Sequence, residues 1–193
     1  MGSNTTESKA ISRLKELPTA QLRPSALVDF VLFFACDKPA VRLIVDTEEC
    51  SEAMRFWSIR QGLDFASDRV GFACVGVHSG SAVSILEIDR RVEPHEIELG
   101  LALGYPLCCC ESMACVGESN IDSRAVEIAA WKFDGEYRRI NPQGYRSGGA
   151  LISHLPCSPV CEASLMIANR ARKFLLEHKS ESMLSGLFRS LDL

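Results

Sequence analysis

The spacing of apolar positions predicts three elements early in the chain. Pro24 offers a helix start, and the apolar residues that follow it recur at helical spacing. Val41–Val45 is a short, mostly apolar run rich in β-branched residues, which predicts a buried strand. Thr47 is a suitable N-cap for a further helix, and Gly62 is expected to end that helix.

The following apolar runs first favour strands and then return to helical spacing. Val70–Val77 and Ala82–Ile88 are rich in β-branched residues and flank a short polar turn, which predicts a β-hairpin. Beyond this hairpin the pattern predicts four helices, at 94–103, from Pro106 onward, at 124–133 and at 159–177. The sequence therefore predicts an α+β fold, with a small, mostly antiparallel sheet in the first half and helices dominating the second half.

The length of 193 residues fits one domain. Residues 1–22 are polar and are expected to form a flexible arm, and residues 23–193 are expected to form a single globular domain. The last amphipathic stretch, 181–188, fits packing within the chain and packing in a homo-oligomer equally well.

Charge and hydropathy narrow the classes of partner. The net charge of −4 gives no positive field that would attract nucleic acid. The longest apolar stretch, Ala26–Cys36, is interrupted by Asp29 and is shorter than the roughly 20 residues of a membrane span. The first residues do not resemble a secretory signal, so a cytoplasmic location is expected. The sequence thus predicts a small-molecule substrate and neither a nucleic acid nor a membrane as partner.

Nine cysteines, an odd number, are the chain's most unusual feature. In a reducing compartment, clustered cysteines favour metal ligation or reactive thiols over disulfides. Two segments stand out, Gly104–Cys110 and Ser153–Cys161, and in each a proline stands where a helix is expected to begin. The free N–H groups and partial positive charge of a helix N-terminus stabilise thiolates. The two segments are therefore predicted to form one site.

The predicted metal ligands are Cys157 and Cys161, together with Cys108 or Cys109, and His154 is a candidate fourth ligand. Successive residues of a helix point about 100° apart, so the choice between Cys108 and Cys109 stays open. Cysteine thiolates select iron–sulfur clusters, iron or zinc over hard cations. An iron–sulfur cluster or iron is the preferred cofactor, and zinc is the alternative.

Three functions fit such a site. The preferred hypothesis is a metal-dependent enzyme that acts on a small polar molecule by sulfur transfer, elimination or redox chemistry. The first alternative is a structural zinc site in a binding module. The second is a metal-free enzyme, with Cys157 or Cys109 as nucleophile and His154 as base. Cys109 is the preferred partner of His154, because nucleophile and base usually come from separate elements. The chain is accordingly expected to be an enzyme, and its reaction class stays open.

The loop 141–149, directly before the second cysteine segment, offers groups for substrate binding. Arg146 can clamp a carboxylate or a phosphate, and Gly148 and Gly149 can present backbone N–H groups. An ordinary turn-rich connection explains the same residues.

The two segments together resemble the pattern of a small, uncharacterised microbial family. The matching motifs are Gly-Tyr-Pro-x-Cys-Cys at 104–109 and Ser-His-x-Pro-Cys-Ser-x-x-Cys at 153–161. The resemblance covers about residues 95–175. It implies that the two segments form one site, and it implies no particular reaction.

Overall fold

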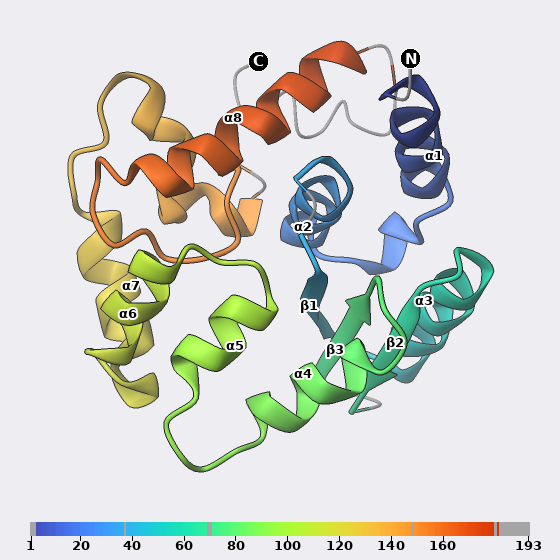
Figure 1. Cartoon of the computed structure of the whole chain (residues 1–193), viewed down its shortest axis with the longest axis horizontal. Coiled ribbons are helices and arrows are strands. Elements are labelled where there is room, and N and C mark those ends of the chain that lie inside the picture. The colour runs from blue at the N-terminus through green and yellow to red at the C-terminus, as the bar shows by residue number, and fades with distance from the viewer. Residues whose placement is uncertain (1–2, 37, 69–70, 148, 180, 182–193) are drawn as a thin grey trace.

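The computed structural model describes residues 3–36, 38–68, 71–147, 149–179 and 181. Within these residues a small antiparallel sheet lies in the first half of the chain and helices make up most of the second half (Figure 1). The predicted α+β fold is thereby confirmed.

The elements follow one another along the chain as helices interrupted by three strands. Their order and bounds are α1 Ser3–Lys15, η1 Thr19–Gln21, α2 Pro24–Ala35, β1 Ala40–Val45, α3 Glu48–Arg60, β2 Asp64–Ser67, β3 Gly71–Gly76, α4 Ser81–Asp89, α5 Glu96–Ala102, α6 Leu107–Ala114, η2 Glu118–Asn120, α7 Ile121–Ala129, η3 Gly135–Ile140, η4 Pro142–Ser147 and α8 Glu162–Glu177.

The sheet has the order β1-β3-β2, and both pairings are antiparallel. Strand β1 buries one face along its whole length and the other face only at its start. Val41, Leu43 and Val45 join the main core, whereas Ala40 joins a smaller core on the opposite face. The face that carries Val41, Leu43 and Val45 is therefore fully buried, whereas the opposite face carries Arg42 and the exposed Ile44 beyond Ala40.

The main core lies between the sheet and the helices α1, α2, α3 and α8, and the smaller core lies between the sheet, α4 and α5. Helix α2 is nearly all apolar because it is surrounded on several sides, and Phe30 on it contacts the ring of Trp57 edge-on at 5.1 Å. Figure 1 shows α5, α6 and α7 grouped beside the sheet and α8 crossing one end of the molecule.

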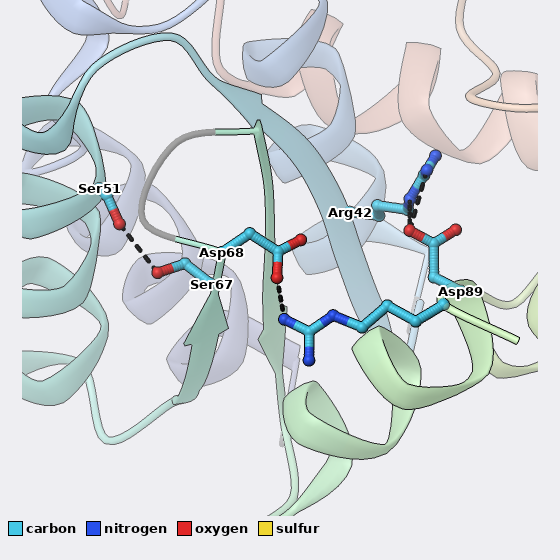
Figure 2. A network of polar contacts seen from close by, with 6 residues as sticks. Arg42, Ser51, Ser67, Asp68 and Asp89 are labelled. Carbon is cyan, nitrogen blue, oxygen red and sulfur yellow. Dashed lines mark hydrogen bonds and ion pairs between the residues drawn. The ribbon is translucent and has the colours of Figure 1, made fainter.

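Polar contacts fasten two helices to the sheet (Figure 2). Arg42 on β1 donates from Nε to the carboxylate of Asp89, at the end of α4, over 3.0 Å. The hydroxyls of Ser51 on α3 and Ser67 on β2 lie 2.9 Å apart. The first contact joins α4 to β1 and holds the guanidinium of Arg42 in place, and the second joins α3 to β2.

The predicted hairpin is wrong in its second half. β3 pairs with β1 and β2, and the run that follows it forms helix α4. Ala82, Ile85 and Leu86 are buried at helical spacing, and the carboxylate of Asp64 accepts a hydrogen bond from the backbone N–H of Ala82. An acidic group at a helix N-terminus is stabilising, and this one comes from a distant strand, where local sequence does not reveal it.

The segment predicted as an arm, 1–22, forms α1 and η1 over its described part. Leu14 and Leu17 belong to the main core, and Trp57 donates from Nε1 to the backbone carbonyl of Arg13 over 3.2 Å. Of the predicted amphipathic stretch 181–188, all but Glu181 lies outside the described residues. No helix in the described part of the chain is long and apolar enough to cross a membrane.

Candidate metal centre

The first cysteine segment is positioned by a sharp turn between α5 and α6. Gly104 has a φ of +76°, which favours glycine, and its N–H bonds to the carbonyl of Leu101 over 2.9 Å. The N–H of Tyr105 bonds to the carbonyl of Gly100 over 2.8 Å, which completes a Schellman motif. Pro106 then caps α6, as predicted from its position, and brings the cysteines into the first turn.

The second cysteine segment is irregular and leads into α8. The helix begins at Glu162 with Cys161 as its N-cap, so the predicted helix start at residue 159 is wrong by three residues. Both prolines of the segment precede the helix, and they keep the chain extended or turned up to Cys161. Cys157 therefore lies in a turn-rich loop and not on the first turn of a helix.

Four cysteine sulfurs meet between these segments. The Sγ–Sγ distances are 3.9 Å from Cys108 to Cys109, 4.0 Å from Cys108 to Cys161 and 3.7 Å from Cys109 to Cys161. All four sulfurs, including that of Cys157, lie within 4.8 Å of one another. The segments do form one site, and both Cys108 and Cys109 reach it.

The size of the sulfur cluster matches a single ion. Four sulfurs arranged tetrahedrally around one ion, with bonds of about 2.3 Å, are separated by about 3.8 Å from each other. The distances of 3.7 to 4.0 Å for three of the pairs are close to this value. In an iron–sulfur cluster with four cysteine ligands the thiolates are divided among several irons, which places some of the sulfurs farther apart.

The four cysteines differ in exposure and in pKa. Cys108 is exposed and Cys157 is partly buried, whereas Cys109 and Cys161 are buried. Burial raises the pKa of Cys109, and burial with the neighbouring sulfurs raises the pKa of Cys157 to about 11. Burial also opposes ionisation of Cys161, but hydrogen bonds from Ser164 and the other thiols outweigh it and lower the pKa to about 7. In the metal-free chain Cys161 is thus the first of these three thiols to ionise.

Ser164 and His154 form a polar contact behind the sulfurs. The fully buried Ser164 donates from Oγ to the sulfur of Cys161 over 3.3 Å, and its Oγ lies 3.5 Å from the sulfur of Cys109. His154 Nε2 lies 2.8 Å from the same hydroxyl. Burial and the nearby Lys38 lower the pKa of His154 to about 3, so the imidazole is neutral near pH 7.

His154 was predicted as a metal ligand or a catalytic base, and it lies beside the sulfurs rather than among them. Its ring packs on that of Tyr105, with a centroid distance of 5.1 Å. It contacts the cluster through Ser164, which no motif pointed out. Ser164 follows Cys161 by three residues, which is about one helical turn, and this spacing could have indicated that the two side chains are neighbours. The catalytic roles predicted for His154 and Cys109 stay predictions.

The other five cysteines lie outside the sulfur cluster. Their positions are Cys36, Cys50, Cys74, Cys110 and Cys115, and none of the chain's nine cysteines forms a disulfide. Cys110 is buried with its sulfur 3.8 Å from the carbonyl of Tyr105, and Cys115 is exposed at the end of α6. Neighbouring helical residues point in different directions, so Cys110 faces α5 while Cys109 faces the cluster.

The loop predicted to bind substrate is only partly described. Gly148 and the side chain of Arg146 lie outside the described residues. The N–H of Gly149 bonds to the carbonyl of Gly144 over 2.6 Å, so this donor is used within the loop. Tyr145, which the sequence did not single out, donates to the carboxylate of Asp29 over 2.6 Å. Substrate binding by Arg146, Gly148 and Gly149 stays a prediction.

A second polar cluster, also missed from the sequence, is buried at the centre of the molecule. Lys38 and Asp29 are almost fully buried, with Nζ 3.8 Å from Oδ1, and Lys38 donates to the hydroxyl of Ser153 over 2.7 Å. Burial lowers the pKa of Lys38 and raises that of Asp29, although each charge partly offsets the effect on the other. Ser153 lines four cavities that open around this cluster.

Comparisons of the chain with models of protein families, with curated proteins and with solved structures found no match.

Proposed function

We propose that the chain is a metalloprotein in which Cys108, Cys109, Cys157 and Cys161 together hold one thiophilic ion, zinc or iron. The observation that carries the proposal is the gathering of these four sulfurs within 4.8 Å of one another. Tetrahedral coordination by four sulfurs is typical of zinc and of iron.

Two helix N-termini and a hydroxyl at the cluster stabilise negative charge there, and they act against the burial that raises the pKa of Cys109 and of Cys157. Cys108 lies in the first turn of α6, and Cys161 caps α8, so the positive ends of two helix dipoles point to the cluster. The hydroxyl of Ser164 adds a hydrogen bond to sulfur. Contacts of this kind orient metal ligands and strengthen binding.

Four thiolates fill a tetrahedral coordination shell, which distinguishes this centre from an open catalytic site. Zinc with four thiolates is a structural centre, whereas iron with the same ligands can carry one electron. An enzymatic role requires that one ligand be displaced by the substrate. Cys108 is the exposed ligand, so it is the one that an incoming small polar molecule can displace. Sulfur transfer, elimination or redox chemistry at the ion would require that displacement.

The proposal is tested by purifying the full chain without oxygen and measuring zinc, iron and acid-labile sulfide per chain. We expect one zinc or one iron per chain and no sulfide. X-ray absorption at the metal edge is expected to give a single shell of about four sulfurs near 2.3 Å. Sulfide together with two or more irons per chain would contradict the single-ion centre in favour of a cluster.

Matched cysteine variants assign the ligands. Cys161→Ser removes a buried ligand and is expected to abolish stoichiometric metal, whereas Cys115→Ser changes an exposed cysteine outside the cluster and is expected to retain it. Equal metal content in the two variants would refute the ligand assignment. Displacement of Cys108 is tested separately, because Cys108→Ser is expected to keep the ion with weaker affinity.

A further inference from the structure

Beside the sulfur cluster lies a cavity of about 250 Å³ that the proposed metal centre does not use. It lies between α5, α6, the start of α7 and the segment 153–155, and its apolar wall is formed by Leu99, Leu103, Met113, Ile121 and Leu155. An apolar cavity of about 150 Å³ is enough to hold benzene, so this cavity has room for a ring with small substituents. An apolar cavity with a few polar groups in its wall is the usual form of a small-molecule site.

The charged groups of the wall are already engaged within the protein. Arg42 is bound by Asp89, with Nε and Nη2 each 3.0 Å from the same carboxylate oxygen (Figure 2). Glu96 also has an interaction partner, and the hydroxyl of Ser153 accepts a hydrogen bond from Lys38 over 2.7 Å. A charged ligand would lose its hydration in this mainly apolar cavity with little compensation, so the cavity favours an uncharged molecule.

His95 brings an unused hydrogen-bond acceptor to the wall. The residue precedes α5 as its N-cap, and it is only 6% exposed. Its Nδ1 lies 2.8 Å from the carbonyl of Glu93, so Nδ1 donates and the neutral ring presents Nε2 as an acceptor. Among the residues that the structure describes, Nε2 has no hydrogen-bond partner. Buried polar groups normally have a partner, so a ligand that donates a hydrogen bond to Nε2 complements this wall.

The wall also offers favourable contacts for an aromatic ring. Tyr105 and His154 both line the cavity, and their ring centroids lie 5.1 Å apart with a tilt of 35°. Met113 adds a thioether. Aromatic rings pack well against other rings and against the sulfur of methionine, so the wall suits a flat aromatic ligand.

We propose that this cavity binds a small uncharged phenol. The ring packs on the apolar wall, on Tyr105 and on Met113, and the phenolic hydroxyl donates to Nε2 of His95. Cys109 belongs both to the wall and to the sulfur cluster, so the bound phenol lies next to the proposed metal centre. None of the contacts to the phenol involves the ion, so the phenol site does not depend on the proposed function.

Three probes of similar shape test the chemistry of the cavity: p-cresol, p-xylene and p-toluate. Near pH 7.5 the cresol is neutral, because a phenolic hydroxyl has a pKa of about 10, and the toluate is an anion. Binding to the full chain is measured by calorimetry and by protein-observed NMR. We expect p-cresol to bind at least as tightly as the more apolar p-xylene, and about tenfold or more tightly than p-toluate. Any other order of affinities, or no saturable binding of p-cresol, would overturn the proposal.

A pair of histidine variants tests the hydrogen bond to the hydroxyl. His95→Phe keeps a ring at this position and removes both nitrogens, so it is expected to weaken p-cresol about 5- to 10-fold and to leave p-xylene unchanged. His78→Phe, at an exposed position outside the cavity, is the control and is expected to change neither affinity. Equal weakening of p-cresol and p-xylene by His95→Phe would mean that Nε2 does not bind the hydroxyl.

A pair of leucine variants on α5 locates the bound ring. Leu99→Trp fills part of the cavity and is expected to abolish the binding of p-cresol and of p-xylene. Leu101→Trp, at an exposed position of the same helix, is expected to leave both affinities unchanged. Unchanged binding to Leu99→Trp would place the probes outside this cavity and overturn the proposal. The leucine pair keeps the test decisive if His95→Phe does not fold.

Metal content, measured on the same samples, separates this proposal from the proposed function. Stoichiometric metal without binding of p-cresol overturns the phenol site and leaves the metal centre standing. Binding of p-cresol that His95→Phe weakens, in a chain that holds no metal, supports the phenol site and overturns the metal centre.

Discussion

Ser164 is the most informative single residue for testing the metal centre, because it contacts the sulfurs without being a ligand. Its hydroxyl donates to Cys161, lies near Cys109 and is 2.8 Å from Nε2 of His154. Ser164→Ala removes the hydroxyl and leaves all four sulfurs in the chain. The variant therefore tests whether the hydroxyl stabilises the metal centre, because the four proposed ligands are all kept.

Two magnitudes follow from these contacts. Loss of a partner that orients metal ligands typically costs 10- to 100-fold in metal affinity, which is about 1.4 to 2.7 kcal/mol. The partly buried His154 loses its hydrogen-bond partner at Nε2, which costs about 1 kcal/mol of stability even without metal. We therefore expect Ser164→Ala to weaken metal binding 10- to 100-fold and to lower the melting temperature of the metal-free chain.

Metal affinity is measured by competition with a chromophoric chelator, and stability by thermal melting of the metal-free chain. The control is Ser58→Ala, because Ser58 is equally buried and its hydroxyl has no hydrogen-bond partner in the described structure. Ser58→Ala is expected to leave metal affinity unchanged. If Ser164→Ala binds metal within twofold of the control, the hydroxyl does not support the centre and the reasoning fails.

The remaining predictions concern protons and the buried ion pair. In the metal-free chain the pKa values of Cys109 and Cys157 are raised, the latter to about 11, so metal loading between pH 7 and 10 is expected to release at least these two protons. Metal affinity is followed by chelator competition. It should fall about 100-fold for each unit by which the pH is lowered, because two protons compete with the ion. The fall should be steeper below about pH 7, where Cys161 is protonated as well. A pH-independent affinity would contradict this assignment. Lys38→Met leaves Asp29 buried without its cation and is expected to cost about 3 to 5 kcal/mol in urea unfolding, and adding Asp29→Asn should recover part of the loss. Equal stability of the single and double variants would argue against the ion pair.

The sequence predicted the elements whose signals are local. Thr47 was expected to cap α3, and its hydroxyl accepts a hydrogen bond from the N–H of Cys50 over 3.1 Å. The run 82–88 was misassigned because its β-branched residues favour a strand, whereas the helix depends on Asp64 and on burial against the sheet. Tertiary contacts outweighed local propensity there, which periodicity alone does not reveal.

The sulfur site was predicted from the type and clustering of its residues, and its ligand geometry was not. Helical spacing predicts that the side chains of Cys108 and Cys109 point in different directions. Both sulfurs nevertheless reach the cluster, because the second cysteine segment is an irregular loop that approaches α6 from the side. In the sequence, Asp29 only interrupts an apolar run. A charge in the middle of a buried helix indicates a partner inside the fold, and Lys38 and Tyr145 are those partners.

The main core is extensive enough for the chain to fold without the metal. It spans the sheet and several helices, including residues far from the cysteines, so removing the ion leaves most of the buried apolar surface intact. The ion would still join Cys109 to Cys161, which are 52 residues apart, and a cross-link of that span restricts the unfolded chain by about 4 kcal/mol. Chelation is therefore expected to lower the melting temperature while far-ultraviolet circular dichroism stays native, unlike a zinc finger. Unfolding on chelation would place the ion among the determinants of the fold, whereas an unchanged melting temperature would mean that the four sulfurs hold no ion that matters to stability.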